Sequence, residues 1–246
     1  MTSLDPYLGL AERYDWMKGG NPAREQFFRT LFAERRVRKV LDCACGTGHD
    51  LILFNSLGCQ VSGSDLSEAM LAQARKNLAA AGLDVPVRRA DFCELPGLYD
   101  TGFDAVVCLS NAINEAVEEG QTLRALRSMR SVLRAGGILV LDQGQTDAGM
   151  RNPPRFDPTV NNRDFTRVLV TDYDGDIATV NILDFIHTDD TSDFIPSVVR
   201  IRIRLQESWR HVLGEAGFDQ VQFLGDWEFT QYDKETSRRM IVVAQK

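Results

Sequence analysis

The sequence predicts an α/β fold built on a doubly wound, mostly parallel sheet of seven strands. Two observations carry this prediction. Between residues 37 and 142, short apolar runs alternate with helical patterns, as they do where helices connect parallel strands. The chain also has 246 residues, of which 43% are apolar, which is enough to bury one sizeable core. We therefore expect residues 1–246 to form a single domain.

Five apolar segments are the predicted parallel strands, and two near the end of the chain complete the sheet as an antiparallel pair. The five lie at residues 37–43, 60–63, 85–90, 103–109 and 138–142, and the pair lies at 221–224 and 240–244. Helices are expected at 48–57, 67–81, 122–134 and 207–216. Ser67 is the expected N-cap of the second helix, and Gly82, Gly136-Gly137 and Gly217 are expected to end the last three.

Two segments lie outside this alternation. Residues 143–205 begin with a loop at Pro153-Pro154 and continue with β-rich runs at 165–172, 177–187 and 198–205, which predict an antiparallel β insertion on the substrate side. Residues 1–36 are predicted to form N-terminal helices that act as a lid over the ligand edge of the sheet.

Composition excludes several classes of function. A net charge of −7 disfavours a nucleic-acid partner, because a grip on phosphates needs a basic face. Five cysteines, an odd number, indicate reduced thiols rather than a disulfide framework. No apolar run approaches a membrane span, no secretory signal is visible, and the three histidines lack metal-ligand spacing. We expect a cytoplasmic protein with a small-molecule substrate and no metal; the sequence is compatible with a homo-oligomer.

A glycine-rich turn follows the first predicted strand. Gly46 and Gly48 allow a sharp turn and a close approach of backbone to ligand. The three-glycine pattern of dinucleotide-binding enzymes fails here, since its third position is Leu51. Asp65 ends the second strand 19 residues after Gly46, close to the spacing at which a carboxylate accepts both hydroxyls of a ribose. The turn therefore predicts a site for an adenosine-like cofactor other than a nicotinamide dinucleotide.

Three motifs in this region resemble those of the Rossmann-like class I S-adenosylmethionine (SAM)-dependent methyltransferases. They are D-x-A-C-G-T-G from Asp42, G-S-D-L-S-E-A-M-L from Gly63 and A-D-F from Ala90. The resemblance implies SAM as cofactor, with Gly46 and Gly48 under its methionine part and Asp42 supporting its amino group. It also implies that the remaining cofactor-binding residues are Ala44, Asp65 at the ribose, Leu66 and Met70 beside the adenine, Asp91 at the adenine amino group, Phe92 beside the ring, and Leu109.

Further segments are similar to the glycine N-methyltransferase group, including the glycine/sarcosine enzymes. They are Leu109-Ser110-Asn111, Pro153-Pro154, Val168-Leu169-Val170 and Leu224-Gly225-Asp226-Trp227. This similarity implies that Tyr7 and Arg24 reach over SAM, with Arg24 at the methionine carboxylate. One position departs from the group: Gly144 stands where an arginine binds the substrate carboxylate. Glycine is therefore not the expected substrate.

The predicted function is methyl transfer from SAM to a small molecule, an amine in the first instance. Two alternatives stay open: a SAM-binding regulatory or assembly module without turnover, and an O- or C-methyltransferase of a larger metabolite. Asn111 is a candidate substrate-binding residue, although it can equally satisfy loop backbone. His187 is either a structural residue or a general base. Arg200, Arg202 and Arg204 form either a solvated face or a replacement anion anchor, and no catalytic residue is identified.

Overall fold

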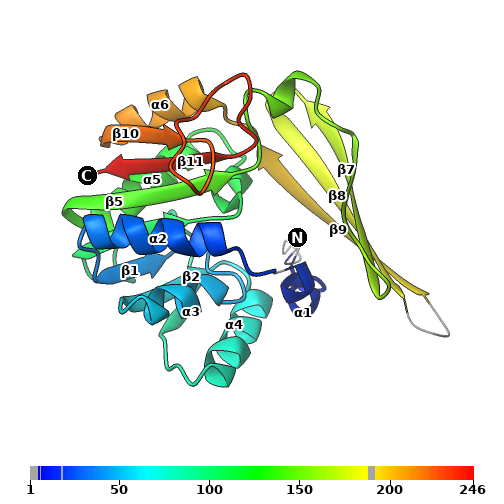
Figure 1. Cartoon of the computed structure of the whole chain (residues 1–246), viewed down its shortest axis with the longest axis horizontal. Helices are drawn as coiled ribbons and strands as arrows, with labels where there is room; N and C mark the ends of the chain where they lie inside the picture. The colour runs from blue at the N-terminus through cyan, green and yellow to red at the C-terminus, as the bar shows by residue number, and fades with distance from the viewer. Residues whose placement is uncertain (1–4, 6, 18, 188–191) are drawn as a thin grey trace.

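The computed structural model describes residues 5, 7–17, 19–187 and 192–246. Seven strands form a central sheet in the order β10-β11-β5-β4-β1-β2-β3 (Figure 1). The strands are β1 (Lys39–Asp42), β2 (Gln60–Asp65), β3 (Val87–Arg89), β4 (Phe103–Cys108), β5 (Leu133–Gln143), β10 (Asp219–Leu224) and β11 (Met240–Gln245). β11 runs antiparallel to both β5 and β10, and the other pairs are parallel. The predicted seven-stranded, doubly wound fold is confirmed.

Helices cover both faces of the central sheet. On one face lie α2 (Pro22–Glu34), α3 (His49–Ser56) and α4 (Glu68–Ala80), and on the other lie α5 (Gln121–Val132) and α6 (Gln206–Glu215). The strands serve both layers because successive side chains point to opposite faces: Leu139 and Leu141 pack with α5 and α6, whereas Ile138 and Val140 pack with the other helices. This two-sided burial explains why the strands appear in the sequence as continuous apolar runs.

The helix ends follow the predicted capping chemistry at two places and differ at a third. The Ser67 hydroxyl accepts from the Met70 N–H over 3.1 Å, and Gly217 ends α6 with a φ of +86°. Gly136-Gly137 does not close α5: that helix ends at Val132, and both glycines lie inside β5. A Cβ on Gly137 would come within 3.0 Å of two backbone oxygens, so this glycine permits the close passage of the strand past β4.

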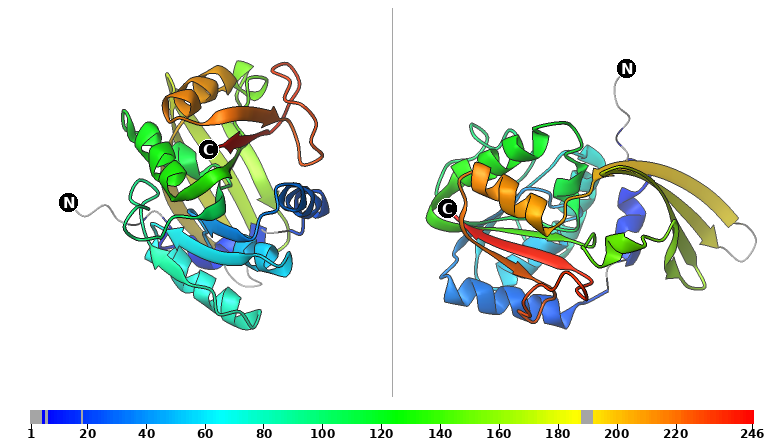
Figure 2. Two further views of the ribbon diagram at one scale, coloured as in Figure 1. Left: turned by 90° about the vertical axis from the view of Figure 1, so that its left-hand side faces the viewer. Right: turned by 90° about the horizontal axis from the view of Figure 1, so that it is seen from above.

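The segment after β5 forms a second, four-stranded antiparallel sheet in the order β6-β7-β8-β9. Its strands are β6 (Phe156–Asn161), β7 (Phe165–Asp174), β8 (Ile177–His187) and β9 (Ser192–Arg202). Figures 1 and 2 show this sheet arching away from the carboxyl edge of the central sheet. The antiparallel insertion was predicted, but β6, which contains Pro158, was not. β9 also ends at Arg202, three residues before the predicted boundary.

The N-terminal segment divides into two parts with different positions. α2 buries Phe27, Phe28, Leu31 and Phe32 against the central sheet, so it belongs to the core layer. The short α1 (Ala11–Tyr14) and the 3-10 turn η1 (Asp15–Met17) lie instead between the two sheets (Figures 1 and 2). Of the helices that the structure describes, none is both long and apolar enough to cross a membrane.

Candidate functional site

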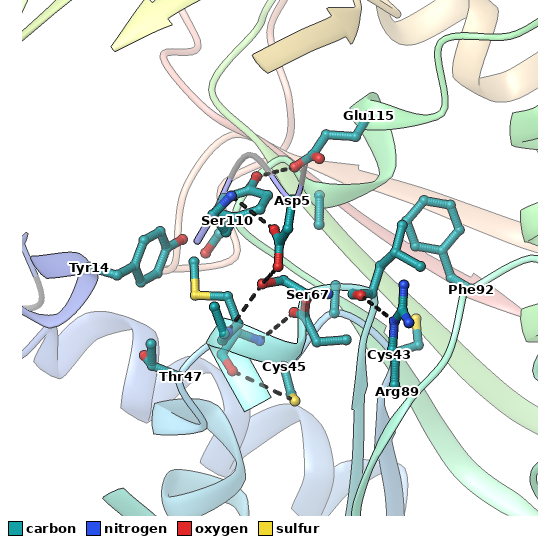
Figure 3. A pocket seen from close by; sticks show the side chains of 18 of the residues that line it. Asp5, Tyr14, Cys43, Cys45, Thr47, Ser67, Arg89, Phe92, Ser110 and Glu115 are labelled. Atoms are coloured by element: carbon teal, nitrogen blue, oxygen red, sulfur yellow. Dashed lines mark hydrogen bonds between the residues drawn. The ribbon is translucent and has the colours of Figure 1, made fainter. Parts of the chain in front are cut away.

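Two cavities lie where the carboxyl ends of the parallel strands face the second sheet. The first, of about 560 Å³, opens at the ends of β1, β2 and β4 and is seen from close by in Figure 3. The second, of about 600 Å³, lies between this edge and one face of the second sheet. The carboxyl edge is the usual position of ligands in open α/β sheets. Nine of the predicted cofactor-binding residues line the first cavity: Tyr7, Ala44, Gly46, Asp65, Leu66, Met70, Asp91, Phe92 and Leu109.

The glycine turn is held against the end of β2 by Asp65. One oxygen of this carboxylate accepts from the Gly46 N–H over 2.8 Å, and the other accepts from the Ser67 N–H over 2.9 Å. Burial raises the pKa of Asp65, while these two backbone donors favour its charged form. Each carboxylate oxygen has a further lone pair, and Asp65 lines the cavity, so it can also accept from two vicinal hydroxyls.

Two residues of the turn support its shape and do not line the first cavity. Gly48 has a φ of +86° at the start of α3, and a Cβ there would lie 3.3 Å from the Cβ of Ala74 on α4. Gly48 therefore permits helix packing, whereas Gly46 lines the first cavity. Asp42 is 1% exposed and accepts from the Ala44 N–H over 3.2 Å, and burial raises its pKa well above the usual range.

The part of the first cavity between the ends of β2 and β3 has partly apolar walls. Leu66 is 58% exposed and Met70 is buried, so together they offer an apolar wall. Phe92 lies across the cavity in Figure 3. The Asp91 carboxylate accepts from the Cys93 N–H over 2.8 Å and also lines the cavity, where it can accept from a ligand amine. This combination of apolar walls and a carboxylate suits a purine with an exocyclic amino group.

Arg24 does not line either cavity. Its guanidinium makes two hydrogen bonds to the Asp50 carboxylate, at 2.5 and 2.7 Å, and lies 5.3 Å from the ring centroids of Phe28 and Trp227. Asp50 does line the first cavity. The structure thus places Arg24 behind Asp50, and its predicted bond to a ligand carboxylate would require this ion pair to open.

Asp15 fastens the N-terminal segment to the glycine turn. Its carboxylate accepts from the Thr47 hydroxyl at 2.5 Å and from the Asn77 amide at 2.7 Å, and it lies 3.0 Å from His49 Nε2. These bonds bring Tyr7 and Tyr14 over the cavities, and both tyrosines line the first and the second. Burial raises the pKa of Tyr14 to about 12, so this hydroxyl stays protonated at neutral pH.

The second cavity has an apolar wall and a polar wall. Leu169, Val180, Ile182, Val199 and Ile201 project into it from the second sheet. The opposite wall carries Asn111, whose side-chain oxygen accepts from the Gly144 N–H over 2.7 Å. Asn111 therefore lies at the second cavity, as predicted for a substrate residue, and it also fixes the loop after β5.

The positions of His187 and of the alternating arginines bear on two predictions that the sequence left open. Because Val199 and Ile201 face the second cavity, the alternating Arg200 and Arg202 lie on the opposite face of β9, and they do not form an anchor there. Arg204 follows the strand and is 9% exposed. His187 pairs with the Thr166 hydroxyl at 2.9 Å and lines neither cavity, which favours its structural role.

Four residues line both cavities and mark their junction: Tyr7, Tyr14, Ser110 and Glu115. The Ser110 N–H donates to Asp142 at 2.6 Å, so the end of β5 holds the loop that follows β4. Glu115 ends the 3-10 turn η2 (Ala112–Glu115), and the Tyr7 hydroxyl donates to it. Ser110 and Glu115 were not predicted as site residues. The sequence offers one indication of their role: both residues follow β4, a strand that ends at the ligand edge of the sheet.

The part of the chain that contains β1 to β4 and the start of β5 matches a known protein family. Residues 40–137 match the family model described as a methyltransferase domain. A glycine/sarcosine N-methyltransferase of Aphanothece halophytica is 32% identical over 143 residues, which cover 56% of this chain and 54% of that protein. A second glycine/sarcosine N-methyltransferase, from Parasynechococcus marenigrum, is 34% identical over 141 residues, which cover 56% of this chain and 50% of that protein. The chain thus spans about half the length of these curated relatives.

Solved structures match over nearly the whole chain. A SAM-dependent methyltransferase from Clostridium acetobutylicum has a TM-score of 0.84 at 16% identity, covering 98% of this chain and 99% of that one. A sugar N-methyltransferase from Streptoalloteichus has a TM-score of 0.75 at 26% identity, covering 96% and 92%. The first likeness concerns the fold alone, and both include the second sheet that lies outside the matched family model.

Proposed function

Since the chain carries a methyltransferase domain of the SAM-dependent class, we propose that it transfers the methyl group of SAM to an amine of a small molecule. The domain match and the glycine/sarcosine N-methyltransferase relatives support this reaction class and SAM as the methyl donor. The acceptor and the roles of individual residues are the subject of the proposal.

The observation that carries the proposal is the junction of two cavities of similar size. A methyl transfer needs the donor and the acceptor on opposite sides of one carbon atom, in line. SAM in the first cavity, with its ribose at Asp65 and its adenine between Met70 and Phe92, would direct its sulfonium toward the junction residues. The acceptor would then approach from the second cavity, which supports a two-substrate reaction rather than the binding of SAM alone.

The size and lining of the second cavity support an acceptor larger than an amino acid. A volume of about 600 Å³ lies in the range that accommodates molecules of drug size. The apolar side chains of β7, β8 and β9 would cover a carbon skeleton, and Asn111 and Arg238 could bind polar groups. Gly144, which has no side chain to bind a carboxylate, disfavours glycine itself. An amine acceptor is further supported by the names of the relatives, glycine/sarcosine and sugar N-methyltransferases.

Little acid–base machinery is required for the displacement itself. The sulfonium of SAM is an excellent leaving group, so alignment of nucleophile, methyl carbon and sulfur supplies much of the rate enhancement. The nucleophilic amine must be neutral, and a closed, partly apolar site lowers the pKa of an amine because burial disfavours its charged form. The second sheet and the segment held by Asp15 would provide that closure.

The proposal is tested by measuring SAM binding and SAM consumption on the same preparation. Calorimetric titration should show one SAM site, and incubation with methyl-labelled SAM and an extract of small metabolites should produce labelled products. Binding without consumption across fractionated extracts would contradict methyl transfer and favour the regulatory or assembly module. Label on oxygen or carbon of the isolated product would contradict the amine acceptor.

A further inference from the structure

Glu115 occupies a position that the displacement itself does not explain. It is one of four residues shared by both cavities, and it is the only acidic one among those four. Figure 3 shows its carboxylate above that of Asp5. The bond from the Tyr7 hydroxyl engages Oε1. Among the residues that the structure describes, none donates a hydrogen bond to Oε2, which is left to a ligand at the junction.

The surroundings of Glu115 favour a cation beside it. Among the residues that the structure describes, no lysine, arginine or histidine forms an ion pair with this carboxylate. Burial raises the pKa of Glu115 to about 7, and the negative charges of Asp65 and Asp5 add to the shift, while the Tyr7 bond opposes it. A partly buried, charged carboxylate without a cationic partner is unfavourable, because it has lost part of its hydration. A cationic ligand beside Glu115 would be attracted to this charge and would offset the lost hydration.

We propose that Glu115 binds the protonated amine of the acceptor at the junction and removes one proton from it before methyl transfer. This inference rests on the proposed function. In the step, an N–H bond of the ammonium breaks and an O–H bond forms on Glu115, leaving a neutral amine. The nitrogen lone pair then forms the bond to the methyl carbon while the carbon–sulfur bond breaks, and its electron pair stays on sulfur. Glu115 releases its proton to water as the products leave.

Tyr7 is the positioning residue in this arrangement. Its hydroxyl fixes one oxygen of Glu115, so the other oxygen keeps a defined direction toward the acceptor. The pKa of Tyr7 is raised well above its ordinary value by burial and by Glu115, so the hydroxyl remains a donor over the whole neutral range. The segment held by Asp15 would therefore complete the site as well as cover it.

The test needs no knowledge of the acceptor. Sinefungin is a SAM analogue in which a CH–NH3+ group replaces the methylsulfonium, so it places an ammonium at the transfer position. S-adenosylhomocysteine has no charge there. At pH 8, calorimetry on the whole chain should give a ratio of sinefungin affinity to S-adenosylhomocysteine affinity that falls at least tenfold in Glu115→Gln. Glu119→Gln, an exposed carboxylate of the following loop, is the matched control and should leave the ratio unchanged.

A second measurement keeps the proposal testable if Glu115→Gln fails to fold. In the unaltered chain the same ratio should fall as the pH drops below about 7, because Glu115 is then protonated. The other titratable or charged groups that line the two cavities are Asp5, Tyr7, Tyr14, Cys43, Cys45, His49, Asp50, Asp65, Glu68, Arg89, Asp91, Asp157, Arg167, Tyr173 and Arg238. Glu115→Asp should retain the dependence, whereas Glu115→Gln should abolish it if Glu115 is its source. An unchanged ratio in folded Glu115→Gln, or a ratio independent of pH, would overturn the proposal. Failure of the unaltered chain to bind S-adenosylhomocysteine at all would instead refute the proposed function.

Discussion

The backbone N–H of Gly46 donates to the carboxylate of Asp65 over 2.8 Å, which joins the glycine turn after β1 to the end of β2. The bond makes one carboxylate serve two purposes. It fixes the backbone of the turn on which a ligand would lie, and its remaining lone pairs face the first cavity. The spacing of 19 residues between these positions in the sequence is therefore a structural requirement as well as a ribose-binding pattern.

Replacing Asp65 by Ala should weaken SAM binding by about 1.5–3 kcal/mol, the scale for losing hydrogen bonds to a charged group. The fold should persist, because Asp65 lies at a strand end. Calorimetric titration with SAM measures the change, with Asp84→Ala, an exposed carboxylate, as the control. Unchanged SAM affinity in a folded Asp65→Ala variant would contradict the ribose assignment.

The chain should be stabilised by SAM and by S-adenosylhomocysteine but not by NAD or NADP. Leu51, which is fully buried in α3, stands where a dinucleotide fold needs its third glycine to bring helix and pyrophosphate together. Thermal-shift measurement with each of the four compounds distinguishes the cases. Stabilisation by NAD alone would refute the identification of the first cavity as a SAM site.

Much of the fold follows from local signals in the sequence. Ser67 and Gly217 act as expected because capping and positive φ are properties of single residues and their neighbours. The prediction that Gly136-Gly137 ends α5 was wrong, and β6 was not predicted, for the same reason: both features depend on a neighbouring strand. Gly137 has to pass close to β4, and Pro158 is tolerated at the edge of the second sheet.

The site was predictable where it is built from one motif and not where distant segments meet. Asp65 and Asp91 lie at or just after strand ends and Met70 lies in the first turn of α4, all within the motifs of the resemblance, which therefore located them at the first cavity. Glu115 is brought beside Tyr7 across 108 positions of the sequence, and no spacing rule covers such a pair. Arg24 is paired with Asp50, a contact that neither the resemblance nor the helix pattern indicated.

Removing the charge of Glu115 should stabilise the unliganded chain at alkaline pH. Its pKa is about 7 in the fold and near 4.5 in an unfolded chain, so the folded state holds the extra proton between these values. The contribution of Glu115 to the free energy of unfolding is fully present below pH 4.5 and is lost as the pH rises through 7. Glu115→Gln should exceed the unaltered chain by roughly 2 kcal/mol in unfolding free energy at pH 8.5, with little difference at pH 5. Denaturant titration at both pH values measures it; equal stabilities at pH 8.5 would contradict the buried carboxylate.

Changes at Asn111 should affect the acceptor more than SAM. Asn111 has a φ of +66° and holds the Gly144 N–H beside the second cavity. Asn111→Gly keeps this backbone conformation available and removes only the side chain. We expect the KM for the acceptor to rise about tenfold, as for the loss of one positioned hydrogen bond, with SAM affinity nearly unchanged. Steady-state kinetics on an identified acceptor and SAM titration provide the two values, and parallel losses in both would contradict the separation of the cavities.

The central claim is that a small molecule enters the second cavity and receives the methyl group. The most direct measurement is incubation of the chain with methyl-labelled SAM and separate pools of metabolites, tRNA, DNA and protein, with glycine assayed alongside. We predict label in the metabolite pool and slow turnover of glycine, since Gly144 provides no side chain for a carboxylate. Label mainly in a macromolecular pool would contradict the small-molecule acceptor, and rapid methylation of glycine would contradict the argument from Gly144.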